Sequence, residues 1–513
     1  MKKVNVKNVK IVYLPLDERP CNYEYPALLV NGTGVNLVRP DLEIMGQKKQ
    51  PGDTDRLGVW LEEECKNADG AIVALDTLLY GGIVPSRLHD LNEEEIGKRI
   101  DRLRGLKRQN PKLKLFALHL IMRCPQYSSS DEEPEYYGLY GRELFQKGYI
   151  THRHELGLAS EDELEELRRI EEVLPEEVET DYLGRRALNR AANQAVLRYV
   201  EEGIIDFLII PQDDSATYGW TAKDQQLLRD EMTLRNVELS SLMYPGADEA
   251  GCTLIARMIN EMNGDMPFVY PRFSGVGAPF VTPLYEDRPL FESVKYQILA
   301  AGGQVAASAQ EADMILLVNA PGAEMTESNN QPSPEASYQV LRNAVELVEY
   351  GSFIMKRFRK PVAVGDVAYA NGGDLQLLKL LRQKGILFDL AGYAGWNTSS
   401  NTLGTVIAQM MLFTRYGRTE GHLDFLALRY VEDCGYCASV RKLLSQGQVQ
   451  EMGYSYFEID GRRGQIASLV REKLGQFIHE HVDTENTRVK ITDVYMPWNR
   501  MFEVGVTVKV AED

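Results

Sequence analysis

The sequence predicts an α/β protein built on parallel β-sheets. Short apolar runs rich in Val, Ile and Leu recur along the chain, and amphipathic segments with many charged residues separate them. Such uninterrupted apolar runs are typical of strands that helices cover on both faces, whereas a strand with one face in water alternates between apolar and polar residues. The chain has 513 residues, of which 44% are hydrophobic, and a chain of this length holds about two to four domains.

Seven apolar runs precede residue 285 and predict the strands of a first domain. They span residues 11–16, 35–38, 71–75, 113–121, 207–210, 239–244 and 268–270. We expect residues 1–285 to form a parallel-sheet domain that resembles a (β/α)8 barrel, with an insertion of a polar loop and helices at residues 123–206. Because seven strands are counted and this barrel has eight, two open Rossmann-like sheets in tandem are the alternative.

The alternation of strands and helices restarts after residue 285. Further apolar runs at residues 303–308, 314–319, 361–366 and 387–393 predict a smaller α/β domain over residues 286–416. Residues 417–513 end in two strand-like runs, 489–495 and 502–510, and predict a small C-terminal α+β piece.

The composition limits the partners and the compartment. Lys and Arg total 57 against 75 Asp and Glu, which gives a net charge of -18. This charge repels phosphate backbones and anionic lipids, so we expect no nucleic acid and no membrane as partner. Six scattered cysteines and the lack of a long apolar run favour a cytoplasmic protein with reduced thiols. Formation of a homo-oligomer is left open.

Polar residues follow the strands of the first domain, where parallel α/β folds bind their ligands. We predict these strand-end residues as substrate-binding: Asp17, Arg19, Asn22, Arg39, Asp76, Tyr80, Arg123, Tyr218, Asp248, Glu249 and Arg272. Any one of them could instead cap a helix or a turn, but ionisable groups at seven consecutive strand ends favour a binding site.

Two adjacent carboxyl groups, Asp213 and Asp214, follow the fifth predicted strand. Burial beside a like charge holds one carboxyl protonated near neutral pH while the other stays ionised, which is what an acid and its partner need. The alternative is that Asp214 or Ser215 caps the next helix. We predict Asp213 and Asp214 as catalytic.

The second domain contributes two polar runs after its strands, at residues 365–374 and 392–404. They place Trp396 beside Asn397 and Asn401, with Asn371 in the other run. An aromatic ring with neighbouring amides is suited to stack on a sugar ring and to bind its hydroxyl or acetamido groups. We predict these four residues as substrate-binding.

Several common motifs are missing from the sequence. It has no phosphate-binding G-x-x-x-x-G-K-[ST] loop, no G-x-G-x-x-G after a strand, no G-x-S-x-G and no H-E-x-x-H. We therefore predict no cofactor and no metal, although an oxygen-liganded Mg or Ca among Asp17, Asp76, Asp213 and Asp248 stays open.

Six strings in order support a family resemblance: PLDERPCN, ALDTLLYGGIVPSR, PQDDSATYG, YPGADE, GDVAYANGGD and AGWNTSSNTLGT. Together they resemble the bacterial domain-of-unknown-function 4127 family along nearly the whole chain, and that family has no settled activity. A weaker likeness is to substrate-assisted β-N-acetylhexosaminidases, which carry an acidic pair at a strand end. This likeness implies that Asp213 orients the acetamido group and that Asp214 protonates the leaving oxygen.

Three functions remain as hypotheses. The leading one is a glycoside hydrolase that acts on a small sugar, with or without an N-acetyl group, by carboxylate acid/base catalysis. A metal- or phosphate-dependent enzyme would bind a small anionic substrate through strand-end arginines, namely Arg19, Arg39, Arg87, Arg123 and Arg272. A two-lobed protein that only binds a small ligand is the third.

Overall fold

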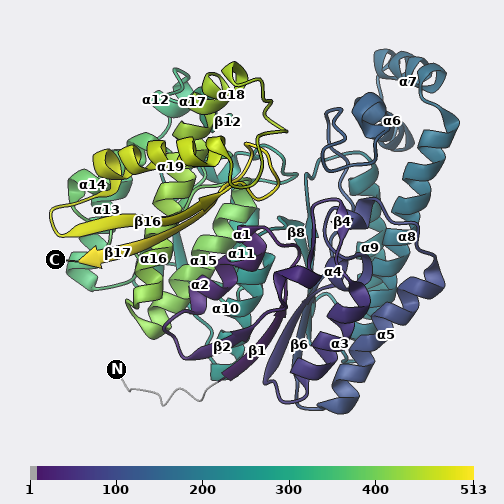
Figure 1. Cartoon of the computed structure of the whole chain (residues 1–513), viewed down its shortest axis with the longest axis horizontal. Helices are drawn as coiled ribbons and strands as arrows, with labels where there is room; N and C mark the ends of the chain where they lie inside the picture. Colours follow the sequence, from purple (N-terminus) through teal and green to yellow (C-terminus); the bar gives the residue numbers. More distant parts are fainter. Residues whose placement is uncertain (1–8, 513) are drawn as a thin grey trace.

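The computed structural model describes residues 9–512, and its first lobe contains an open sheet of six parallel strands (Figure 1). The strand order is β2-β1-β5-β6-β7-β8. The strands are β1 (Val9–Leu14), β2 (Val35–Val38), β5 (Gly70–Ala74), β6 (Lys114–Leu118), β7 (Phe207–Gln212) and β8 (Ser241–Pro245). The order reverses between β1 and β5, and ligands of such sheets bind in the crevice outside the carboxyl ends of the strands at this point.

Four helices cover one face of this first sheet: α3 (Thr54–Cys65), α5 (Glu93–Gln109), α8 (Glu176–Glu201) and α9 (Trp220–Arg235). The other face packs on α2 (Tyr25–Val30) and α10 (Ala250–Asn263). Both faces of the sheet are therefore buried, which explains why the strands are apolar without alternating polar residues.

The second lobe repeats the same topology with five parallel strands in the order β10-β9-β11-β13-β15. They are β9 (Phe268–Phe273), β10 (Gln304–Val305), β11 (Met314–Asn319), β13 (Val362–Asp366) and β15 (Gly392–Ala394). Helices α11 (Leu290–Ala300), α13 (Ala344–Phe358) and α15 (Ser399–Tyr416) contact its strands. Helix α14 (Leu375–Lys384) packs on α13. The sequence expectation of an α/β chain with parallel sheets is confirmed.

The strand predicted at residues 268–270 changes lobes. It is β9, which pairs with β10 and β11 and so belongs to the second sheet rather than to a domain ending at residue 285. Among residues 9–512 no closed barrel forms, and the strand order matches the alternative of two open sheets. The reason lies in α10, which is buried on almost every side because it packs against α15, α11, α2 and the first sheet. This helix carries the chain from one sheet to the other.

The helical layer between the sheets is tightly packed. A Cβ atom on Gly404 of α15 would lie 2.2 Å from the Cγ of Glu249, immediately before α10. Only glycine permits this approach, because no real side chain fits at such a distance. The two lobes are thereby joined along a buried interface, and residues of both lobes line the cavity between them.

The predicted insertion forms a helical arm. Helices α6 (Tyr137–Glu155) and α7 (Glu161–Val173) project from the first lobe, and α8 returns the chain to the sheet (Figure 1). A capping box between Ser160 and Glu163 begins α7. The loop before α6 contributes Tyr127 and Glu132, among other residues, to the lining of the cavity between the lobes.

The C-terminal residues combine helices with one antiparallel hairpin. Helix α16 (Glu420–Arg429) continues into a π-helix at Tyr430–Val440 and then α17 (Arg441–Ser445). After α18 (Gln448–Glu451) and α19 (Gln465–Phe477), the two predicted strands pair as β16 (Thr487–Tyr495) and β17 (Gly505–Glu512). The turn between them reaches the first lobe, where the Trp498 indole donates a hydrogen bond to Glu18 over 2.7 Å.

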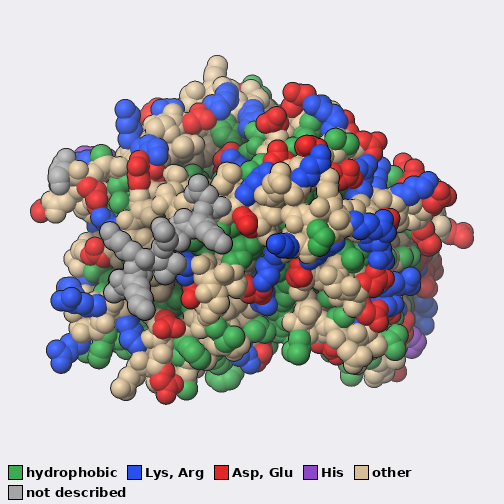
Figure 2. All heavy atoms as spheres, turned by 90° about the horizontal axis from the view of Figure 1, so that it is seen from below, with side chains coloured by type: hydrophobic (Ala, Val, Ile, Leu, Met, Phe, Trp, Pro, Cys, Tyr) green, Lys and Arg blue, Asp and Glu red, His purple; other side chains and the backbone are tan. Residues whose placement is uncertain are grey.

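The surface and the thiols give three further observations. No helix within residues 9–512 has the length and apolarity needed to cross a bilayer. On the face shown in Figure 2, Lys and Arg side chains are interspersed with Asp and Glu. All six cysteines lie in the described part of the chain, and each is buried and unpaired.

Candidate functional site

A polar cavity of about 280 Å³ lies between the two lobes at the carboxyl ends of the strands. The first lobe contributes strand-end residues to its lining, namely Arg19, Arg123, Asp213, Asp214 and Asp248. The second lobe contributes Asn371 and Asn397, and the C-terminal turn contributes Arg500 and Phe502. Seven residues predicted from strand ends therefore converge on one cavity, although they come from segments far apart in the sequence.

The adjacent carboxyl groups after β7 share a guanidinium group. Arg123 Nη1 lies 3.3 Å from Asp214 Oδ2 and 3.7 Å from Asp213 Oδ2, and Arg87 donates to Asp213 over 3.0 Å. Neither carboxyl caps the following helix, whose N-cap is Gly219. Burial, and then the neighbouring Asp213, raise the pKa of Asp214 to about 7.

Two glutamates of the insertion loop complete this ionic network. Glu132 and Glu133 both pair with Arg87 and Arg123, and Glu132 also pairs with Arg500 of the C-terminal turn. Although burial raises it, the pKa of the Glu132 carboxyl lies well below its usual range because Arg123, Arg500 and Arg87 surround it. Each of these three arginines is therefore already engaged by carboxylates.

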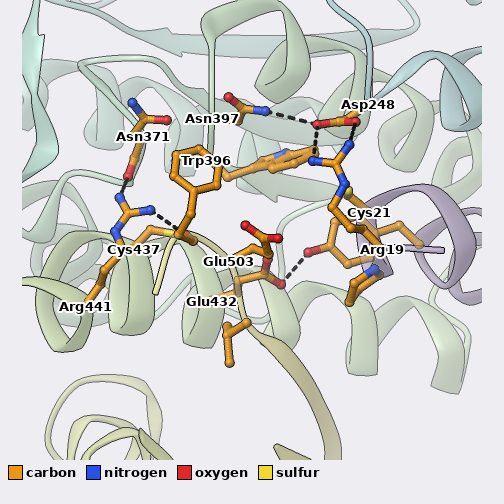
Figure 3. A pocket seen from close by; sticks show the side chains of 14 residues that line it. Arg19, Cys21, Asp248, Asn371, Trp396, Asn397, Glu432, Cys437, Arg441 and Glu503 are labelled. Carbon is orange, nitrogen blue, oxygen red and sulfur yellow. Dashed lines mark hydrogen bonds and ion pairs between the residues drawn. The ribbon is translucent and has the colours of Figure 1, made fainter. Parts of the chain in front are cut away.

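A second ionic cluster joins residues that follow β1 to Asp248, which follows β8. Arg19 and Asn397 donate to the Asp248 carboxylate over 2.6 and 3.2 Å (Figure 3). Asn22 donates to the same carboxylate over 2.9 Å, and Arg19 also donates to Asp17 over 2.6 Å. Asn401 accepts a hydrogen bond from the Asp248 backbone over 3.0 Å. Burial raises the pKa of Asp248, and Arg19 opposes that shift. The predicted residues Asp17, Asn22 and Asn401 thus do not line the cavity themselves. They hydrogen-bond to Arg19 or Asp248, which do.

The backbone around the cavity is unusual. Of the eight non-glycine residues with positive φ in the described chain, four line the cavity: Asp214 (φ 45°), Tyr285 (φ 68°), Asn371 (φ 60°) and Asn397 (φ 51°). Asp and Asn tolerate this conformation, whereas for a bulky residue such as Tyr285 it is strained. Strained residues of this kind gather at functional sites because the surrounding fold holds them in place.

Two predicted residues lie beside the cavity rather than in it. Burial raises the pKa of Asp76 to about 7, and Asp76 lines a small neighbouring cavity together with Arg87 and Asp213. Trp396 lines another small cavity, of about 30 Å³, and meets Tyr25 edge-on (Figure 3). Because 7% of its surface is exposed, Trp396 offers little surface for the stacking on a sugar ring that the sequence predicted.

Besides Asp17, Asn22, Asp76, Trp396 and Asn401, five further predicted site residues do not line the cavity: Arg39, Tyr80, Tyr218, Glu249 and Arg272. Arg39 forms an ion pair with Glu24, and Arg272 forms one with Glu346. The Tyr80 ring stacks on His89, and the Tyr218 ring lies under the Arg153 guanidinium. The Glu249 carboxylate accepts a hydrogen bond from Gln297. Arg272 lies within β9 rather than after it as predicted, and the side chains of all five residues are held by protein partners.

Sequence reasoning missed several lining residues, in particular Tyr127, Glu132, Tyr285, Phe457, Arg500 and Phe502. Glu132 did carry a signal, since it belongs to an acidic run close behind the strand-end Arg123. Tyr285 and Arg500 carried none, because a loop conformation and a long-range contact place them.

The described residues contain no group of three or more His, Cys, Asp or Glu side chains that could hold a metal ion. The four aspartates considered for Mg or Ca are divided. Asp17 and Asp248 share Arg19, whereas Asp213 pairs with Arg87, and Asp76 accepts a hydrogen bond from the Leu120 backbone.

The fold and the cavity define a two-lobed α/β protein with a polar site at the carboxyl edges of two open sheets. The chain belongs to the family described as protein of unknown function (DUF4127), whose model matches residues 11–507. This match confirms the family resemblance and adds nothing in favour of the hexosaminidase likeness. A search among curated proteins found no match.

Proposed function

We propose that this protein is a glycoside hydrolase that uses Asp214 as its general acid. One observation carries the proposal: a half-buried carboxyl with a pKa of about 7 lines a polar cavity of about 280 Å³. A general acid must hold its proton near neutral pH, and Asp214 meets that requirement beside the ion-paired Asp213.

The cavity wall suits a neutral, hydroxylated ligand. Its arginines are paired with carboxylates, so a strongly anionic substrate would have to replace those partners. Three aromatic residues in the lining keep large exposed fractions: Tyr127 (51%), Phe457 (50%) and Tyr285 (37%). Exposed rings beside carboxylates and amides offer stacking faces and hydrogen-bonding groups, which a sugar ring needs together.

A second carboxylate is needed to activate water. Asp213 and Asp214 contact the same nitrogen of Arg123 and so lie on one side of a bound ligand. Asp248 belongs to a separate cluster around Arg19 and lines the same cavity. We assign the base role to Asp248, and we assign to Asp213 the role of keeping its neighbour protonated.

The proposed reaction balances as a hydrolysis. Asp214 gives its proton to the oxygen that leaves the anomeric carbon, and that oxygen keeps the electron pair of the broken C–O bond. Water supplies a hydroxyl group to the anomeric carbon and its proton goes to Asp248. Proton exchange with solvent then restores both carboxyls.

A panel of nitrophenyl glycosides, including N-acetylhexosaminides, tests the proposal. With the corresponding methyl glycosides, whose leaving alcohol must be protonated, we expect Asp214→Asn to lower kcat/KM about 10²- to 10⁴-fold, and the rate of the wild type to fall as the pH rises through about 7, where Asp214 loses its proton. Nitrophenolate leaves without an acid, so the nitrophenyl rates should fall less. Asp230→Asn, an exposed carboxyl on α9, is the matched control and should leave kcat/KM unchanged. Absence of turnover for every glycoside would remove the proposal.

A binding protein is the second candidate, because both lobes frame the cavity. That function predicts that a bound sugar raises the melting temperature of wild type and Asp214→Asn equally, without any product. Product formation by the wild type alone separates the two.

A further inference from the structure

A groove of about 490 Å³ lies next to the cavity and shares three wall residues with it: Asn371, Tyr456 and Phe502. The groove runs between the 3-10 turn Ser328–Asn330, the end of the π-helix with α17, and the segment that follows α18. Its volume falls in the range of about 300–1,000 Å³ that is usual for ligand sites. A ligand that fills the cavity therefore has further space beyond the shared wall.

The shared wall is held rigidly. Arg441 donates to the backbone carbonyl of Asn371 over 2.5 Å and to that of Phe502 over 2.7 Å. Glu327, in the groove, accepts from Asn371 over 3.0 Å and from Tyr285, in the cavity, over 2.5 Å. These bonds join the two spaces through Asn371, whose backbone is itself left-handed. A fixed wall of this kind can position two consecutive units of one ligand.

The charged groups of the groove are bound to protein atoms. Arg441 and Glu327 are engaged as described, and the Lys442 ammonium donates to the backbone carbonyl of Asn329. The remaining lining is neutral and polar or aromatic, including the exposed side chains of Gln446, Gln450 and Tyr454. Amides, hydroxyls and rings recognise uncharged, hydroxylated units rather than ions.

We propose that this groove binds the second and following units of an uncharged oligosaccharide, so that the substrate is a chain of sugars rather than a single glycoside. The inference rests on the proposed function, since it places the bond to be cleaved in the cavity. It names a recognition site, whose lining includes Tyr454 and Gln450, that is distinct from the acid at Asp214.

The first experiment compares chain lengths. For any nitrophenyl monoglycoside that the protein cleaves, the nitrophenyl glycoside of the trisaccharide built from the same sugar should show a kcat/KM at least about tenfold higher, because both release nitrophenol and differ only in chain length. Tyr454→Ala should reduce the trisaccharide value about five- to tenfold, because it removes one stacking face, and should leave the monoglycoside value unchanged. Phe280→Ala, an exposed aromatic residue outside both spaces, is the matched control.

The second experiment does not depend on turnover. Calorimetry measures binding of four trisaccharides to Asp214→Asn, with and without Tyr454→Ala: the β-1,4-linked trimers of glucose, N-acetylglucosamine and mannose, and the α-1,4-linked trimer of glucose. We expect one of them to bind, and Tyr454→Ala to weaken it about five- to tenfold.

The outcomes separate the groove from the chemistry. Cleavage of monoglycosides without any gain for longer chains overturns the groove and leaves the hydrolase intact. Tyr454-dependent binding without cleavage by the wild type supports the groove and overturns the hydrolase. Binding that Tyr454→Ala does not alter, or no binding at all, overturns the groove.

Discussion

At the carboxyl end of the first sheet, Asp213 and Asp214 face a cavity of about 280 Å³, whereas at the same end of the second sheet Asp366 faces other protein groups. Asp366 accepts from Asn319 over 2.9 Å and from the Tyr393 hydroxyl over 2.7 Å. The two sheets have the same order of their first five strands, and both end in carboxyl groups. Their topology alone therefore does not distinguish a site from a structural network.

The second cluster is closed on itself. Arg342 donates to Asp374 over 2.6 Å and to Asn319 over 3.1 Å, and the side chains of Arg342 and Asp374 are 4% and 2% exposed. Burial, and then Asp374, raise the pKa of Asp366 to about 6. A raised carboxyl pKa thus occurs in both lobes, but of these two carboxyls Asp214 lines a cavity that a ligand can enter, whereas Asp366 contacts protein groups. The combination of shifted pKa and cavity carries the functional argument.

The largest expected effect is on the closed cluster. Arg342→Met leaves Asp374 as a buried charge without its cation, so we expect the free energy of unfolding to fall by about 3–5 kcal/mol. Urea denaturation measures this change. Arg463→Met, at an exposed pair, is the control. A loss below about 1 kcal/mol would mean that the second cluster is not structural and would remove the contrast.

A smaller effect of opposite sign is expected at Asp214. Its pKa is about 7 in the fold against 3.8 as the ordinary value, so the stability that it contributes is present below pH 4 and is lost as the pH rises through 7. Asp214→Asn never carries the buried charge. We expect the variant to be more stable than the wild type by roughly 2 kcal/mol at pH 8, below the full pKa difference because 21% of the side chain remains exposed.

Thermal unfolding of Asp214→Asn and wild type between pH 4 and pH 8 checks this sign. The difference in melting temperature should shrink toward zero at pH 4, where both side chains are uncharged. A variant that is less stable at pH 8 would show that the Arg123 pair outweighs burial and would contradict the assignment of Asp214 as an acid with a raised pKa.

The smallest effect is expected at an exposed ion pair on the C-terminal hairpin. Asp493 pairs with Arg463, and the hydrogen bond from Arg463 lowers the pKa of Asp493. Asp493→Asn should lower the free energy of unfolding by less than about 1 kcal/mol at pH 7, and the difference should vanish as the pH falls through the pKa of Asp493. Urea denaturation at pH 7 and pH 3 measures it. A larger loss would mean that an exposed ion pair with good hydrogen-bond geometry stabilises this protein without being buried.

Much of the fold was readable because strands buried on both faces leave a local signature. The predicted runs at residues 207–210 and 314–319 lie within β7 and coincide with β11. The assignment of residues 268–270 to the first domain was wrong. The apolar residues of a strand predict that it is buried, but they do not determine which strand it pairs with. Pairing was decided by α10, whose burial between the sheets depends on partners such as Gly404 that are remote in sequence.

The site was readable in part for a related reason. Parallel strands bring their ends to one edge of a sheet, so Arg19, Arg123 and Asp248 could be grouped from the sequence alone. The same rule also selected Arg39 and Arg272, which pair with Glu24 and Glu346 outside the cavity. Whether a strand-end side chain turns toward the ligand or toward a protein partner depends on its neighbours in space.

Local sequence was enough to establish the parallel α/β class and the acidic pair, because hydrophobic period and strand-end chemistry act over a few residues. The assembly of a cavity from two lobes and a C-terminal turn required the folded chain. Arg500 meets Glu132 across 368 positions of sequence, and Tyr285 lines the cavity through a backbone angle that its neighbours do not encode. Long-range packing sets both, since loop closure and side-chain burial are properties of the whole chain.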